Sequence, residues 1–98
     1  MRVHVKLLSS LREMLPESGG EQDFDLPDGA SLRDLLLRLG FETYFGEASL
    51  EKGLANAVQV LINQVFEGSL ERILKDGDET VFFPPISGGK GTEFIPGS

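Results

Sequence analysis

The chain has 98 residues, of which 40% are hydrophobic and 26% charged, the proportions of one ordinary globular domain. Its net charge of −7 argues against nucleic acid as a partner, because phosphate binding depends on clustered Lys and Arg. A basic protein partner is compatible with this charge, although acidic surfaces also simply keep proteins soluble. The absence of cysteine excludes disulfides and thiolate chemistry and fits a cytoplasmic protein. No apolar run suits a signal peptide or a membrane span.

The first part of the chain predicts two strands that pair as an antiparallel hairpin. Residues 2–7 alternate polar and apolar side chains, which is the period of a half-buried strand. Residues 22–26 alternate in the same way. Between them, residues 11–15 predict a short helical turn that Pro16 ends, and a polar turn follows.

The clearest local prediction is a helix that begins after Ser31 and ends at Gly40. Ser31 is a typical N-cap residue, and Asp34 three positions later can complete a capping box. Leucines at helical spacing form one apolar stripe: Leu32, Leu35, Leu36 and Leu39. Residues 41–56 show no clear period and are interpreted as a connecting loop, with a helical turn near Leu50.

The second half predicts two further strands. Residues 58–63 are rich in β-branched side chains and predict a strand, after which residues 66–68 form a turn. Residues 70–74 suggest a short helical turn. Residues 75–79 have strong turn chemistry, and residues 80–83 predict the final strand.

This order of elements predicts an α+β fold, in which a mixed sheet packs on one main helix. The arrangement is that of the β-grasp, or ubiquitin-like, roll. A ferredoxin-like sandwich would need a second full helix, and residues 70–74 are too few to form one. We therefore predict a β-grasp domain over residues 1–87 and a flexible tail over residues 88–98.

The predicted domain ends in the sequence Phe-Phe-Pro-Pro-Ile-Ser-Gly-Gly. Pro84 and Pro85 end the strand, because proline cannot donate a ladder hydrogen bond. Gly88 and Gly89 lack a Cβ, so their backbone can lie close to the walls of a narrow enzyme channel. The four residues that follow Pro85 span roughly 13 Å when extended, enough to reach into a neighbouring active site.

Phe82 and Phe83 occupy successive positions of the final strand and therefore point to opposite faces. One of them is expected to lie in the core. The other is either a docking residue for a partner or a second core contact. Together with Pro84 and Pro85 they form the predicted partner-binding segment.

Four elements occur in the order, and near the spacing, of a known family. They are a strand that ends in Asn63, Asp-Gly-Asp-Glu at 76–79, Phe-Phe-Pro-Pro at 82–85 and Gly-Gly at 88–89. With the looser match of the N-terminal half, residues 1–89 resemble the MoaD/ThiS family of ubiquitin-like sulfur carriers. The resemblance is nearest to MoaD, the small subunit of molybdopterin synthase. ThiS, the carrier of the thiamine pathway, is usually shorter and lacks Phe-Phe-Pro-Pro.

The resemblance implies a sulfur carrier that has no catalytic residues of its own and binds no cofactor or metal. In the family, an adenylating enzyme of the ubiquitin-activating type uses ATP to form an acyl-adenylate at the terminal glycine, and sulfur then displaces AMP. The resulting thiocarboxylate enters the large subunit, MoaE, and gives its sulfur to the precursor of the molybdenum or tungsten cofactor. By this resemblance the reactive carboxylate belongs to Gly89, and the inserted tail includes Ile86, Ser87 and Gly88.

The residue chemistry agrees with a carrier that depends on its partners. A carboxylate is a poor electrophile, and this chain has no cysteine to supply sulfur. His4 is the only histidine, and on an alternating strand it is expected to face solvent or pack on the sheet. Asp76, Asp78 and Glu79 are expected to be turn residues, because so few adjacent carboxylates make a poor metal site.

Residues 90–98 tie the carbonyl of Gly89 into a peptide bond, so Gly89 cannot be adenylated until they are removed. A natural extension that a processing protease removes is one explanation. The other is a cloning remnant, because Gly-Thr, Glu-Phe and Gly-Ser are dipeptides that common restriction sites encode. The natural extension is our working prediction.

Other functions stay open at this point. A ubiquitin-like modifier, conjugated through Gly89 to target lysines, would need the same activation. The Phe-Phe-Pro-Pro run favours the sulfur carrier, and the extended tail gives some support to the modifier. A thiamine-pathway type of carrier and a β-grasp interaction module without acyl chemistry are the remaining alternatives.

Overall fold

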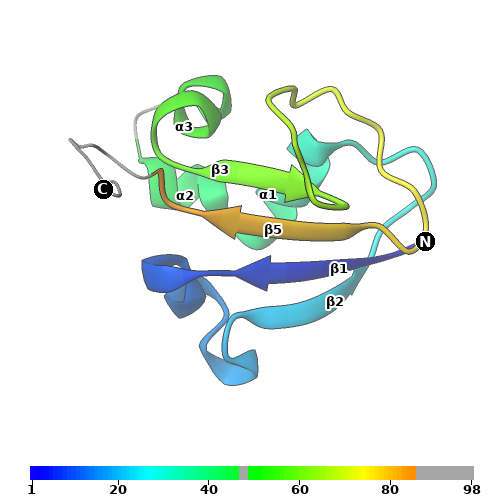
Figure 1. Ribbon diagram of the computed structural model, residues 1–98, viewed down its shortest axis with the longest axis horizontal. Coiled ribbons are helices and arrows are strands. Elements are labelled where there is room, and N and C mark those ends of the chain that lie inside the picture. The colour runs from blue at the N-terminus through cyan, green and yellow to red at the C-terminus, as the bar shows by residue number, and fades with distance from the viewer. Residues whose placement is uncertain (47–48, 86–98) are drawn as a thin grey trace.

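A computed structural model describes residues 1–46 and 49–85 (Figure 1). The predicted tail over residues 88–98 lies outside the described residues, so that division of the chain stays a prediction. The elements, in chain order, are β1 (Arg2–Leu7), the 3₁₀ helices η1 (Ser9–Met14) and η2 (Pro16–Ser18), β2 (Glu21–Asp25), α1 (Leu32–Leu39), α2 (Phe41–Phe45), α3 (Leu50–Asn56), β3 (Gln59–Ile62), β4 (Val65–Phe66) and β5 (Glu79–Phe83).

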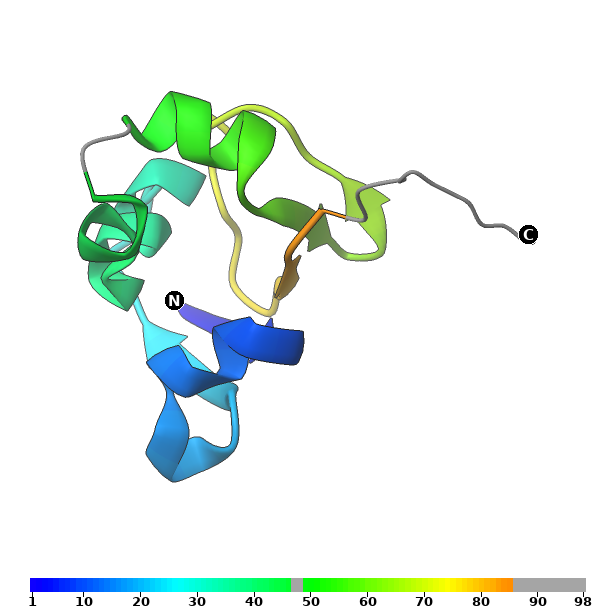
Figure 2. The same ribbon diagram turned by 90° about the vertical axis from the view of Figure 1, so that its left-hand side faces the viewer.

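The sheet has five strands in the order β2-β1-β5-β3-β4. β1 is antiparallel to β2 and parallel to β5, and β3 is antiparallel to both β5 and β4. The last strand in sequence is therefore the central strand of the sheet. Helices α1 and α2 lie behind the sheet in Figure 1, and the turned view of Figure 2 shows them on one side of the strands. This mixed sheet with helices on one face confirms the predicted α+β, β-grasp class.

Both N-terminal predictions are confirmed. The hairpin pairs Val3 with Phe24 and Val5 with Gln22, and its alternation buries Val3, Val5 and Leu7. The turn predicted over residues 11–15 corresponds to η1, which buries Leu11. The apolar positions of β1 thus form one wall of the core.

Helix α1 follows its predicted signals closely. The Asp34 N–H donates to Oγ of Ser31 (3.3 Å), and the Ser31 N–H donates to Oδ2 of Asp34 (2.9 Å), so the capping box is complete. Gly40 follows with φ 90°, a left-handed conformation that favours glycine. The four leucines of the stripe are all buried, which places this face of the helix against the sheet.

The prediction of a connecting loop over residues 41–56 is wrong, because this segment contains α2 and α3. The helical turn predicted near Leu50 is confirmed, since α3 begins at that residue. Phe41 and Phe45 lie one turn apart and stack with ring centroids 5.4 Å apart. Gly53, which weakens the helical signal of α3, is buried, and a Cβ there would overlap the ring of Phe45. Packing therefore overrides weak helix propensity in this segment.

Two predictions for the following segment are also wrong. The chain turns at Asn63 and Gln64, both with positive φ, so Val65 and Phe66 form the short strand β4 instead of leading into a turn at residues 66–68. Residues 70–74 form no helical turn. Carbonyls of Leu70 and Arg72 accept the Arg33 and Leu32 N–H groups at the start of α1, which would otherwise lack partners.

The core lies between the sheet and the helices. Phe41 of α2 and Phe82 of β5 are fully buried and face one another with centroids 5.6 Å apart. Within residues 1–46 and 49–85, no helix is long and apolar enough to cross a membrane.

Candidate functional site

The site predicted from sequence begins where β5 ends. β5 lies between β1 and β3, so it ends at Phe83 in the middle of the sheet, and the chain continues through the half-buried Pro84 and Pro85. We call residues 84–89 the arm, and β5, which is hydrogen-bonded to a neighbour on each side, is its base. The predicted reactive Gly89 and inserted residues Ile86, Ser87 and Gly88 lie outside the described residues, and their roles stay predictions.

The two phenylalanines before the prolines have different positions. Phe82 is 0% exposed and packs on Phe41, so it is the member of the pair that belongs to the core. This corrects the predicted partner-binding set, because a fully buried ring offers no surface to a partner. Phe83 is half-buried on the opposite face, and its ring centroid is 6.1 Å from that of Phe66.

Phe83 lies beside an apolar cluster on the outer face of the sheet, the face that α1 does not cover. The strand register places Phe66 beside Leu61 and Leu61 beside Val81. We call Leu61, Phe66, Val81 and Phe83 the outer apolar patch. Phe66 is 68% exposed, and contiguous exposed apolar patches of this kind are typical of interaction surfaces.

Sequence reasoning missed most of this patch. The sequence predicts a turn at Phe66. It predicts a strand at Leu61 but does not indicate on which face of the sheet that side chain lies. The signal that could have found them is Asn63-Gln64, since Asn often begins a two-residue hairpin turn and such a turn folds Phe66 back beside Leu61.

Asp76 and Asp78 are structural turn residues, as predicted, whereas Glu79 is the first residue of β5. The carboxylate of Asp78 accepts the Lys75 N–H (2.8 Å) and Nδ2 of Asn63 (2.9 Å), and it is 5% exposed. Asp76 accepts the Arg2 N–H at 2.7 Å. These bonds join the turn to β1 and to the β3–β4 hairpin. They therefore fix where β5 begins and how the outer apolar patch is assembled.

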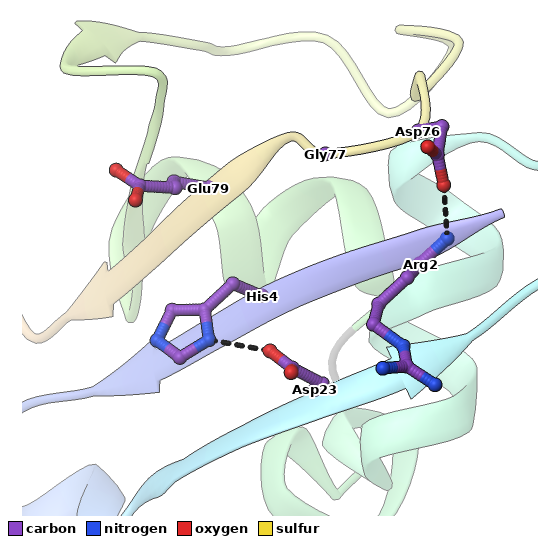
Figure 3. A pocket seen from close by; sticks show the side chains of 6 residues that line it. All are labelled: Arg2, His4, Asp23, Asp76, Gly77 and Glu79. Atoms are coloured by element: carbon purple, nitrogen blue, oxygen red, sulfur yellow. Dashed lines mark hydrogen bonds and ion pairs between the residues drawn. The ribbon is translucent and has the colours of Figure 1, made fainter.

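His4 lies at the other end of the sheet from the arm. It is paired with Glu79, the first residue of β5, whereas the arm leaves from Phe83, the last. An open hollow of about 420 Å³ lies beside it, lined by Arg2, His4, Asp23, Asp76, Gly77 and Glu79 (Figure 3). His4 is partly exposed on the sheet, as predicted. Among the described residues, no group of three or more His, Asp or Glu side chains is arranged to hold a metal ion.

The fold defines a ubiquitin-like β-grasp protein in which Pro84 and Pro85 follow the central strand beside an apolar surface. Residues 5–89 match the sequence pattern of the ThiS family, and the chain belongs to this family.

Three known proteins show where the similarity lies. The "Molybdopterin synthase sulfur carrier subunit" of Chlamydomonas reinhardtii is 32% identical over 89 residues, which cover 91% of this chain and 100% of that protein. A candidate molybdopterin converting factor subunit 1 of Pyrococcus furiosus has a TM-score of 0.67 and 29% identity, over 88% of this chain and 99% of its own. Small archaeal modifier protein 1 of Methanosarcina acetivorans has a TM-score of 0.65 and 33% identity, over 90% and 96%.

Proposed function

We propose that the chain is the sulfur-carrier subunit of a molybdopterin synthase, and that it carries sulfur as a thiocarboxylate on Gly89 after residues 90–98 are removed. The observation that carries the proposal is the extent of the family match, which runs from residue 5 to residue 89 and so ends at the second glycine. The similarity to the whole of the Chlamydomonas sulfur carrier, over 91% of this chain, supports the same role.

The proposed chemistry takes place on partners. The Gly89 carboxylate attacks the α-phosphorus of ATP on an adenylating enzyme, and pyrophosphate leaves. Hydrosulfide then attacks the acyl carbon and displaces AMP, so that its sulfur stays on the carbonyl as the thiocarboxylate. The chain itself provides a narrow tip and a firmly held base, because β5 is hydrogen-bonded on both sides and Pro84-Pro85 lowers the entropy lost when the arm docks.

We assign the docking of a large subunit to the outer apolar patch. Both similar proteins of the molybdopterin pathway are named as subunits, which implies a second subunit in each. The patch adjoins the start of the arm, since Phe83 belongs to the patch and directly precedes Pro84. A partner that covers Phe66 and Phe83 would therefore stand next to the point from which the tail enters it.

A second function is favoured by one observation. The Methanosarcina protein that is 33% identical to this chain is named a modifier. A modifier would transfer the same activated Gly89 acyl group to a lysine amine instead of to sulfur. The two functions therefore differ in the acceptor and not in the fold.

The proposal is tested by reconstituting molybdopterin formation from the pterin precursor and a large subunit. We expect product from the Gly89-ending chain loaded as thiocarboxylate. The same chain with an ordinary carboxylate and the 98-residue chain should give none, because neither presents sulfur at Gly89. Product from the 98-residue chain in the absence of protease and activating enzyme would contradict the proposal.

A further inference from the structure

His4 of β1 lies between two carboxylates of the edge strand β2. Its Nδ1 is 2.6 Å from Oδ1 of Asp23, and its Nε2 is 2.6 Å from Oε2 of Glu21. The hairpin register places Asp23 directly opposite His4, and Glu21 opposite Lys6. Figure 3 shows the His4 ring and the Asp23 carboxylate pointing toward one another. Two carboxylates from alternate positions of one strand thus close on a single imidazole ring.

Both contacts can be hydrogen bonds only when the ring is an imidazolium. An ionised carboxylate accepts hydrogen bonds and donates none, so each ring nitrogen must carry a proton. The bond with Asp23, and then the bond with Glu21, raises the pKa of His4 above its ordinary value of 6.5, against a smaller opposing effect of burial.

Other charges also face this ring. On β1, Arg2 and Lys6 are the neighbouring outward residues, and both are cationic. From β5 and the turn before it, Glu79 and Asp76 line the same hollow and add negative charge. The other acidic group on this face of β2 is Asp25. Its carboxylate accepts a hydrogen bond from Nε of Arg2 at 3.3 Å and so pairs with Arg2 and not with His4.

We propose that His4 is a pH-responsive clasp between β1 and β2. As an imidazolium, the ring is hydrogen-bonded to both Asp23 and Glu21. As a neutral imidazole, it releases Glu21. Neutral imidazole has one N–H and can keep one carboxylate. Asp23 is the one retained, because it lies directly across the strand pair. Glu21 has the longer side chain and a diagonal position, and it then turns to solvent. The neutral ring therefore carries its proton on Nδ1.

The position of β2 explains why such a clasp has an effect on the fold. Among the strands of residues 1–46 and 49–85, β2 is an edge strand with β1 as its one neighbour, and Phe24 is the one buried side chain along it. Its hold on the domain therefore depends on the hairpin hydrogen bonds and on these cross-strand contacts. Because the pKa is raised by folding, the stabilisation is fully present below pH 6.5 and is lost as the pH rises through the higher pKa of the folded state.

The test uses the fact that His4 is the only histidine, so its ring signals in an NMR titration are unambiguous. We expect a His4 pKa above 6.5 in the parent, lowered by Asp23→Asn and by Glu21→Gln. Asp25→Asn is the matched control on the same face of β2, and it should leave the pKa higher than either of these variants does. At high pH the ring ¹⁵N shifts should report the Nδ1–H form.

A second readout follows the hairpin itself. The difference in Tm between the parent and His4→Gln should shrink as the pH rises through the His4 titration, because the parent loses its clasp and the variant has none. A His4 pKa at or below 6.5, an Nε2–H neutral ring or a pH-independent difference in Tm would overturn the proposal. This test is independent of sulfur chemistry and of the proposed function.

Discussion

Replacing Phe82 with alanine should cost about 3–5 kcal/mol of the free energy of unfolding, which is the usual cost of removing a fully buried phenylalanine. Phe82 is 0% exposed, packs on Phe41 and lies on the central strand, so the surrounding sheet cannot collapse into the space left behind. For a domain of this size, such a loss lowers Tm by at least about 12 °C. Thermal unfolding followed by circular dichroism measures it directly.

The matched control is Phe83→Ala, which removes the same side chain from the next position of the same strand. Phe83 is half-buried on the outer face and loses mainly its contact with Phe66, so we expect a cost of about 1 kcal/mol. Equal destabilisation by the two variants would mean that Phe82 is not the core-facing residue of the pair.

Replacing Phe66 with alanine should weaken binding of the large subunit by about 30-fold or more, while the free domain keeps its Tm within a few degrees. Exposed aromatic residues at the centre of an interface commonly contribute 2 kcal/mol or more, about 30-fold in Kd. The ring is 68% exposed in the free domain, so little folding energy depends on it. Isothermal titration of the Gly89-ending chain with the large subunit gives the affinity.

Leu37→Ala is the control for this prediction. Leu37 is also a large exposed apolar residue, at 43%, but it lies on α1, on the other side of the sheet from the outer apolar patch. We expect it to leave the affinity unchanged. If Phe66→Ala binds like the parent and Leu37→Ala does not, the partner docks on the helical layer and the assignment of the patch is wrong.

Local signals were sufficient to predict much of this fold. The alternation in β1 and β2, the Ser31 and Asp34 capping box and the turn before β5 depend on neighbouring residues, which the sequence displays directly. Helix α2 could not be predicted in this way, and of α3 only a helical turn near Leu50 was predicted. They have only five and seven residues, and Gly53 is explained by the ring of Phe45, which lies on another helix.

The site was predictable to a similar extent. Sequence alone pointed to the Phe-Phe-Pro-Pro segment and to Gly88-Gly89, because these residues are consecutive and chemically distinctive. Alternation along the strand places Phe82 and Phe83 on opposite faces of the sheet, but it does not show which of the two faces the core. The outer apolar patch joins residues from three strands, and their neighbourhood exists only after β3, β4 and β5 have paired.

The central claim is that Gly89 becomes a thiocarboxylate, and intact mass measurement tests it most directly. The Gly89-ending chain is incubated with its adenylating enzyme, ATP and a sulfur source. A matched Gly89→Ala chain that also ends at residue 89 reports how far activation depends on the slim terminal residue. We predict that the Gly89-ending chain gains the mass difference between sulfur and oxygen, and that omission of ATP abolishes the gain. An unchanged mass, accompanied by larger lysine-linked conjugates, would contradict the sulfur-carrier account.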